Sequence, residues 1–302
     1  MLTPRQLITL VLLTLLWGLN WPVMKLGVTD FPPLTFRTLS MIGGLPVLAA
    51  TLLALKVPFR IARRDWPALG WLTLTNMVVW QVCIILAIRS LSSGRAAILG
   101  YTMPIFSAMV GAWLFGATLS RRGWLGVGAA ALGVTLLLWH EVTQLAGRPG
   151  GVLLALTAAA VWALGTQLFR RTKIEAATLT LSFWMTAITT AVMGTLALVF
   201  ERAEWKLPAG ATLAAIGYNA LLIFGYAQTA WFYLARSLPP LASTLSVMLI
   251  PVLGVFSGAL WLAEVLHWQD YAAVLLMVLA IASVLWPQQE PKFASAPPAS
   301  RS

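Results

Sequence analysis

Two indoles, an amide and a thioether share one face of the first apolar stretch. In residues 12–25, LLTLLWGLNWPVMK, helical spacings of three and four join Trp17, Asn20, Trp21 and Met24. An amide inside an aliphatic helix needs a hydrogen-bond partner or a wet cavity, because lipid offers neither. The face therefore predicts one wall of a binding cavity. The alternative is a helix contact at Asn20 and interfacial anchoring at Trp21.

Amides, phenols and indoles recur in the other apolar stretches and are candidates for the same cavity. The predicted substrate-binding residues are Trp17, Asn20, Asn76, Trp80, Gln81, Tyr101, Trp162, Tyr218, Tyr226, Gln228 and Ser246. Amides and phenols can bind an ammonium and a carboxylate without a fixed charge, and aromatic faces favour cations and flat groups. The alternative for the amides and phenols is a hydrogen bond between helices, and for Ser246 a bond back to its own helix.

Acidic residues avoid the middle of every apolar stretch. Seven of the nine fall in predicted loops or the tail, whereas Glu264 and Asp270 stand at the ends of stretches. Proton-coupled carriers often need an acid in the middle of the bilayer. We therefore expect transport without obligatory proton coupling, and we expect Glu264 to hydrogen-bond a neighbouring loop.

Cations are equally scarce inside the stretches. Only Lys25 and Arg37 are candidates, each near one end of its stretch. An enzyme acting on lipid would need clustered acids, histidines or arginines, and a carrier of phosphates would need cations facing its cavity. The sequence therefore predicts no catalytic residue, metal site or cofactor. A channel remains an alternative to a carrier.

The composition is that of an integral membrane protein. Of 302 residues, 60% are hydrophobic and 10% charged, and the mean hydropathy is +0.85, whereas soluble domains carry about a quarter charged residues. Ten apolar runs are close to the ~20 residues that a bilayer requires. They are residues 7–25, 34–55, 66–88, 96–117, 123–141, 150–169, 177–200, 209–235, 241–262 and 270–286. The fold class predicted is all-α, with ten transmembrane helices.

The positive charges predict the orientation. With the N-terminus in the cytoplasm, thirteen Lys and Arg residues fall on the cytoplasmic side and six outside, and Arg37 completes the 20. Both termini are therefore expected in the cytoplasm, including a disordered tail, 287–302. The net charge of +11 is dispersed over short loops, so we expect no nucleic-acid partner.

The two halves of the chain repeat. A shift of 147 residues places 89–139 on 236–286 without a gap and gives 11 identities in 51 positions. The same shift places Gln81 on Gln228, and a shift of 145 places Trp17 on Trp162. Five spans per repeat would invert the second half, as in many alternating-access transporters. The predicted units are 1–149 and 150–286, arranged around a central cavity.

Several motifs resemble the EamA type of the drug/metabolite transporter superfamily. They are W-G-x-N from Trp17, F-x-x-x-x-F-R ending at Arg37, Pro104, and L-x-P-V-x-x-x-x-x-G-x-x-x-L-x-E ending at Glu264. The tryptophan-rich character is similar to the YddG-like amino-acid exporters. The second half has Trp-Ala-Leu-Gly from Trp162 instead of W-G-x-N.

The resemblance implies a multi-pass exporter in the bacterial inner membrane. Its expected substrates are amino acids, including aromatic and apolar ones, and the alternative is a multidrug exporter of aromatic or cationic compounds such as methyl viologen. It also implies that spans 1–4 and 6–9 surround the cavity, with spans 5 and 10 at the periphery. The partners expected are the substrate and the lipid bilayer, and the protein is expected to be a monomer.

Overall fold

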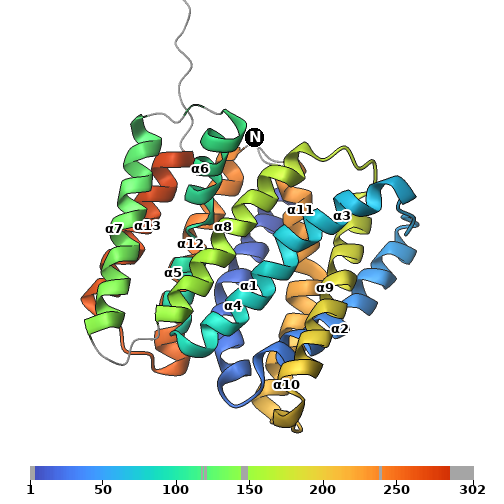
Figure 1. Cartoon of the computed structure of the whole chain (residues 1–302), viewed down its shortest axis with the longest axis horizontal. Helices are drawn as coiled ribbons and strands as arrows, with labels where there is room; N and C mark the ends of the chain where they lie inside the picture. Colours follow the sequence, from blue (N-terminus) through green and yellow to red (C-terminus); the bar gives the residue numbers. More distant parts are fainter. Residues whose placement is uncertain (1–3, 117, 119–120, 144–148, 238–239, 286–302) are drawn as a thin grey trace, which may run out of the picture.

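The chain folds into a bundle of long helices (Figure 1). The computed structural model describes residues 4–116, 118, 121–143, 149–237 and 240–285, and these contain no strand. The long helices are α1 (Pro4–Thr29), α2 (Pro33–Ala54), α7 (Arg121–Thr143), α8 (Pro149–Arg171), α9 (Thr178–Phe200), α12 (Pro240–Leu262) and α13 (Trp268–Leu285). The shorter ones are α3 (Trp66–Thr73), α4 (Val79–Ser90), α5 (Ser93–Gly100), α6 (Met103–Phe115), α10 (Gly210–Tyr218) and α11 (Gln228–Ser237). This confirms the all-helical prediction.

Within the described residues, seven helices are long and apolar enough to cross a membrane, and two shorter apolar ones span Leu249–Leu262 and Trp268–Ser283. The described residues of each predicted run lie almost entirely on a helix or on helices that follow one another directly. Their passage through a membrane as two inverted halves, with both termini in the cytoplasm, remains a prediction. The predicted tail, 287–302, lies outside the described residues.

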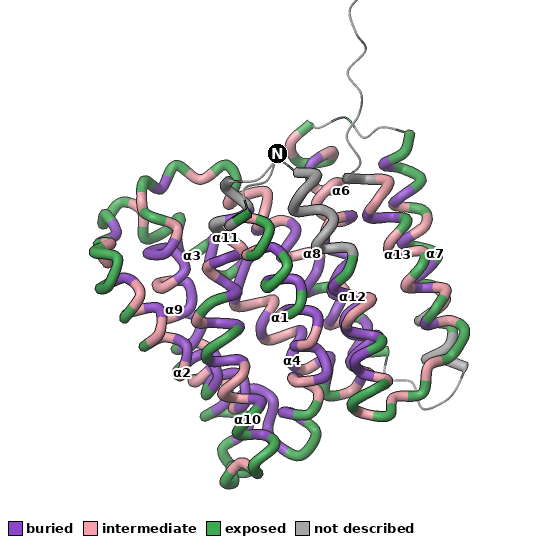
Figure 2. The backbone as a smooth tube through the Cα atoms, turned by 180° about the vertical axis from the view of Figure 1, so that it is seen from behind, coloured by how far each residue is buried: buried purple, intermediate pink, exposed green. Residues whose placement is uncertain are grey.

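Large apolar side chains cover the outside of the bundle as well as its interior. Leu125, Leu260 and Trp113 are among the most exposed, and Figure 2 shows exposed residues along the outer faces of the helices. A soluble protein would bury such groups, whereas lipid solvates them. α7 and α13 pack side by side at one edge of the bundle (Figure 1). The helices of the predicted spans 5 and 10 therefore lie at the periphery of the bundle.

Two wide helical turns interrupt the bundle at corresponding places. The π-helices η2 (Leu74–Val78) and η4 (Asn219–Ala227) each join two shorter α-helices. A shift of 147 residues places 74–78 on 221–225, within η4. Such turns loosen the hydrogen-bond ladder and often occur at functional sites. The apolar pattern of the sequence gives no sign of either turn.

Two further details of the helices differ from the prediction. α1 passes through Pro22 and continues to Thr29, beyond the predicted end at residue 25. Proline removes only one bond of the ladder, and tightly packed membrane helices tolerate this. The fourth span is broken at Tyr101 and Thr102, between α5 and α6, and the break directs the Tyr101 side chain into the interior.

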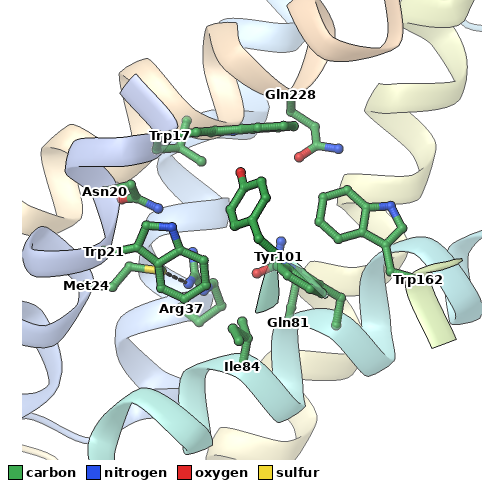
Figure 3. A pocket seen from close by; sticks show the side chains of 12 residues that line it. Trp17, Asn20, Trp21, Met24, Arg37, Gln81, Ile84, Tyr101, Trp162 and Gln228 are labelled. Atoms are coloured by element: carbon green, nitrogen blue, oxygen red, sulfur yellow. Dashed lines mark hydrogen bonds between the residues drawn. The ribbon is translucent and has the colours of Figure 1, made fainter. Parts of the chain in front are cut away.

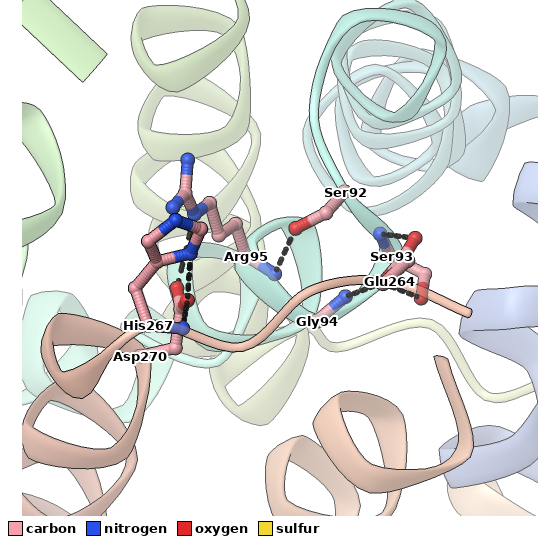
Figure 4. A network of polar contacts seen from close by, with 7 residues as sticks. All are labelled: Ser92, Ser93, Gly94, Arg95, Glu264, His267 and Asp270. Atoms are coloured by element: carbon pink, nitrogen blue, oxygen red, sulfur yellow. Dashed lines mark hydrogen bonds and ion pairs between the residues drawn. The ribbon is translucent and has the colours of Figure 1, made fainter. Parts of the chain in front are cut away.

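At the end of the bundle away from the N-terminus, carboxylates of the second half cap helices of the first half. Glu264 accepts hydrogen bonds from the Ser93 amide (2.7 Å) and hydroxyl (2.8 Å) and from the Gly94 amide (3.4 Å), at the start of α5 (Figure 4). The buried Asp270 carboxylate accepts from Arg95 Nε at 3.0 Å. Glu264 was expected to hydrogen-bond a neighbouring loop, and its partners are instead the first residues of helix α5.

Two further caps lie at the same end. The Glu201 carboxylate, from the end of α9, accepts from the amides of Leu34 (2.9 Å) and Thr35 (2.7 Å) at the start of α2. Lys25 Nζ donates to the carbonyls of Ile88, Arg89 and Leu91 at the end of α4. Carboxylates at helix starts and cations at helix ends both oppose the helix dipole. Lys25 therefore stabilises the C-terminal end of α4.

Candidate functional site

A buried cavity lies between α1, α2, α4, α8 and η4 (Figure 3). Aromatic rings, three amides and one arginine surround it. Its lining residues are Trp17, Asn20, Trp21, Met24, Arg37, Trp80, Gln81, Ile84, Tyr101, Trp162, Ile223 and Gln228. They come from both halves of the chain, so a molecule in the cavity would contact both halves at once.

The aromatic side chains form a connected wall. Trp162 of α8 packs against Trp80 at 4.2 Å between ring centroids and against Trp17 at 6.3 Å, edge to face in both cases. Trp21 meets Tyr101 in the same manner at 6.2 Å. Ring edges and faces in this arrangement present both weakly positive and weakly negative surfaces to a ligand. The wall can therefore hold a flat or bulky apolar group.

Gly100 provides the space for this wall. A Cβ at position 100 would lie 2.9 Å from Cη2 of Trp21 and 3.3 Å from Cη2 of Trp80. Both distances are shorter than an ordinary van der Waals contact between carbon atoms. Only a residue without a side chain lets the two indoles approach the backbone here.

Arg37 is the one charged residue among those lining the cavity. It lies on α2 with 2% of its surface exposed; its Nη1 donates to Asn219 Oδ1 at 3.1 Å and its Nη2 contacts Met24 Sδ at 2.6 Å. The guanidinium also lies over the Phe224 ring, 5.5 Å from the centroid. Within the described residues, its Nε has no hydrogen-bond partner and no carboxylate forms an ion pair with it. Its positive charge therefore lacks a counterion there.

Asn20 has a hydrogen-bond acceptor without a partner among the described residues, whereas Arg37 has a donor without one. The Asn20 side chain is 6% exposed, and its Oδ1 has no hydrogen-bond partner among the described residues. In Figure 3 Asn20 lies beside Met24 and Trp21, on the same side of the cavity as Arg37. The residues that line the cavity thus include a buried acceptor and a buried donor without partners among the described residues, and buried polar groups usually have partners.

Most of the predicted site residues meet at this cavity. Those that line it are Trp17, Asn20, Trp80, Gln81, Tyr101, Trp162 and Gln228. The pairs Gln81/Gln228 and Trp17/Trp162, matched by the internal repeat, both do so. The sequence argument for a shared cavity thus selects a real spatial cluster, and substrate binding by this cluster is a proposal.

Other predicted residues lie elsewhere. Asn76 Nδ2 donates to the Leu72 carbonyl at 3.0 Å, the Tyr218 hydroxyl donates to the Leu16 carbonyl at 2.7 Å, and Tyr226 is 37% exposed. None of these three lines the cavity. The Ser246 side chain, in α12, lies outside the described residues. For Tyr218 the alternative of a hydrogen bond between helices holds, whereas Asn76 bonds back to the preceding turn of its own helix.

The sequence argument missed Arg37, Ile84 and Ile223. Arg37 was expected near one end of a span, without a role in the cavity. α2 begins at Pro33, so Arg37 lies in its first turns, and the long side chain reaches inward to Asn219. An arginine in a membrane helix is itself a signal of function, and this signal could have identified Arg37.

The cavity has a volume of about 50 Å³. A single water needs ~10–15 Å³ by this measure, whereas sites for small molecules have ~300 Å³ or more. In this conformation the cavity accommodates a few waters and must widen for a larger molecule. The π-helix η2 ends three residues before Gln81 and η4 ends directly before Gln228, and π-turns often occur at functional sites.

Comparison with known proteins identifies the family. The chain matches the EamA-like transporter family over residues 5–139 and again over 149–286. A crystal structure of another protein, 21% identical, aligns with a TM-score of 0.66 over 91% of this chain and 96% of that one, which shows a shared fold.

Curated bacterial transporters are similar over most of their length. The uncharacterized inner membrane transporter YedA of Escherichia coli is 27% identical over 93% of this chain and 92% of its own. The probable amino-acid metabolite efflux pump of Salmonella typhimurium is 26% identical over 90% of this chain and 91% of its own. The uncharacterized transporter YoaV of Bacillus subtilis is 23% identical over 86% of this chain and 89% of its own. The chain is a multi-pass membrane protein that belongs to the EamA-like transporter family.

Proposed function

We propose that this protein exports amino acids, including aromatic and apolar ones, across the bacterial inner membrane by alternating access. The inner membrane is also the location given in the name of YedA. The single observation that carries the proposal is the buried cavity of indoles, a phenol and amides, with one arginine. Amides and a phenol can hold the polar groups of an amino acid, while the aromatic wall accepts side chains of different shape. Broad tolerance follows because the lining includes few fixed charges.

The internal repeat supports alternating access. In transporters with inverted repeats, the substrate site lies at the interface of the halves, and one half rocks against the other. Here Trp17 and Gln81 of the first half and Trp162 and Gln228 of the second face the same cavity. Carboxylates of the second half cap helices of the first half at one end of the bundle. These bonds would break when that end opens.

Amino-acid efflux is also the activity in the name of two relatives, the probable amino-acid metabolite efflux pumps of Salmonella typhimurium and Escherichia coli. The alternative substrate, a cationic drug such as methyl viologen, fits the cavity less well. The charge of Arg37 repels cations at short range, and the lining includes no carboxylate to offset it. An amino acid brings its own negative group.

The test is substrate counterflow with purified protein in liposomes, using a panel of amino acids, methyl viologen and a sugar phosphate. We expect saturable, accelerated exchange of bulky apolar amino acids and little exchange of the other two. Exchange of sugar phosphate but of no amino acid would refute the proposal. Flux that rises linearly with concentration would indicate a channel.

A further inference from the structure

We propose that Arg37 binds the carboxylate of the transported molecule and that Asn20 accepts a hydrogen bond from its amino group. This inference rests on the proposed function, because it names the parts of the substrate that the cavity recognises. It is built on two unused polar groups of opposite kind in one cavity, Arg37 Nε and Asn20 Oδ1.

The first observation is that the positive charge of Arg37 has no counterion among the described residues. A buried cation in a membrane protein is costly unless an anion or several acceptors compensate it. Within the described residues the guanidinium has one oxygen acceptor, the neutral Asn219 amide, and a soft sulfur contact to Met24. A guanidinium has five N–H donors, so donors remain for a ligand. A carboxylate is the ligand that matches this fork and supplies the missing negative charge.

The second observation concerns the acceptor oxygen of Asn20. Asn20 Oδ1 is buried and lacks a donor among the described residues. An ammonium group carries three N–H donors and no acceptor. A zwitterion placed with its carboxylate at Arg37 and its ammonium at Asn20 would satisfy both groups. Its side chain would lie toward Trp17 and Trp162 (Figure 3), the second of which packs against Trp80.

A purely structural Arg37 is the competing explanation, since its bond to Asn219 links α2 to η4. The two explanations differ in their consequences. If Arg37 only supports the fold, removing it lowers stability and leaves ligand selectivity unchanged. If it binds a carboxylate, removing it abolishes the preference for acids, and the free protein loses an uncompensated buried charge and stays folded.

Three ligands with one skeleton test the inference. L-phenylalanine has both groups, 3-phenylpropionate lacks the ammonium, and L-phenylalaninamide lacks the carboxylate. Binding is measured by thermal unfolding of the detergent-purified protein across ligand concentrations, and transport by counterflow. We expect L-phenylalanine to bind best, 3-phenylpropionate to bind more weakly, and the amide to bind least.

Arg37→Gln is the decisive variant, because it removes the charge and keeps a polar side chain with N–H donors. We expect its affinity for both acids to fall about 10- to 100-fold, as for the loss of a charge-assisted hydrogen bond, with the amide unaffected. Arg37→Lys keeps the charge and should retain the preference for acids with weaker binding. The matched control is Arg95→Gln, which breaks a buried ion pair with Asp270 at the bundle end and should lower stability without changing the order of ligands.

The outcomes separate this inference from the proposed function. Wild-type protein that binds the amide as well as L-phenylalanine, or binds none of the three, overturns the carboxylate site, as does an unchanged ligand order in Arg37→Gln. Binding of 3-phenylpropionate that depends on Arg37, without any exchange of amino acids, would support the carboxylate site and refute amino-acid export. Exchange of L-phenylalanine that L-phenylalaninamide inhibits as strongly as L-phenylalanine itself would refute the carboxylate site and support amino-acid export.

Discussion

Replacing Glu264 with Gln tests whether this acid stabilises the start of helix α5 or couples transport to protons. The carboxylate accepts from the Ser93 amide and hydroxyl and from the Gly94 amide at the start of α5. The Gln amide keeps one oxygen but loses the charge. A hydrogen bond to a charged group contributes ~1.5–3 kcal/mol, and its interaction with the helix dipole ~0.3–1 kcal/mol. Since Glu264 is only half-buried, water offsets part of this, and we expect a loss of about 1–2 kcal/mol for Gln and more for Ala.

The assay combines stability with transport. Unfolding of the purified protein by denaturant, followed by tryptophan fluorescence, gives the free-energy difference between wild type and Glu264→Gln. Glu204→Gln is the matched control, because the Glu204 side chain forms an exposed ion pair with Arg89, 3.7 Å apart. Such pairs contribute ~0–1 kcal/mol, so we expect little change in the control.

Transport by the same variants is measured with counterflow and with an imposed pH gradient. We expect no obligatory proton coupling in either the wild type or Glu264→Gln. Uphill uptake driven by the pH gradient in the wild type, lost in Glu264→Gln while counterflow survives at unchanged stability, would refute the reasoning. Glu264 would then be the coupling acid.

Three further predictions follow from the fold. Gly100→Ala should displace the Trp21 ring and lower the counterflow rate of bulky substrates more than that of small ones, and equal rates for both would argue against a wall at this place. Lys25→Met should lower unfolding stability by about 1–2 kcal/mol, since three carbonyls lose a charged donor; unchanged stability would mean that water replaces the cap. Topology reporters should place Ser302 in the cytoplasm and Gly147 outside, and a cytoplasmic Gly147 would overturn the inverted repeat.

The helices were predictable because each requires a long apolar run. Membrane helices satisfy their own backbone groups, so length and hydropathy alone locate them. The π-turns η2 and η4 were not predictable, because the wide turn depends on packing between helices and leaves the apolar pattern unchanged. The break at Tyr101 was not predicted, since residues 96–117 were expected to form one span; Pro104 accounts for it, because its ring removes the hydrogen bond to the Gly100 carbonyl and crowds that carbonyl.

The site was predictable in part, from the chemistry of residues that lipid cannot solvate. Trp17, Asn20 and Gln81 were found because an amide or indole on an apolar helix needs a protein partner or a cavity. Asn76 and Tyr218 obey the same rule but satisfy it with backbone carbonyls. Central helices are covered on more than one face, so periodicity does not tell which face borders the cavity. Arg37 was misplaced because the reach of a long side chain is not visible in a span prediction.

The most direct test of the central claim is counterflow of labelled L-phenylalanine by wild type, Trp162→Ala and Trp113→Ala. Trp162 lies in the cavity wall, whereas Trp113 is 68% exposed on the outside of α6. We predict saturable exchange by the wild type, an equal rate for Trp113→Ala, and a rate at least about 5-fold lower for Trp162→Ala, since aromatic ring contacts contribute ~1 kcal/mol or more. Exchange by Trp162→Ala at the wild-type rate and affinity would show that substrate does not pass through this cavity.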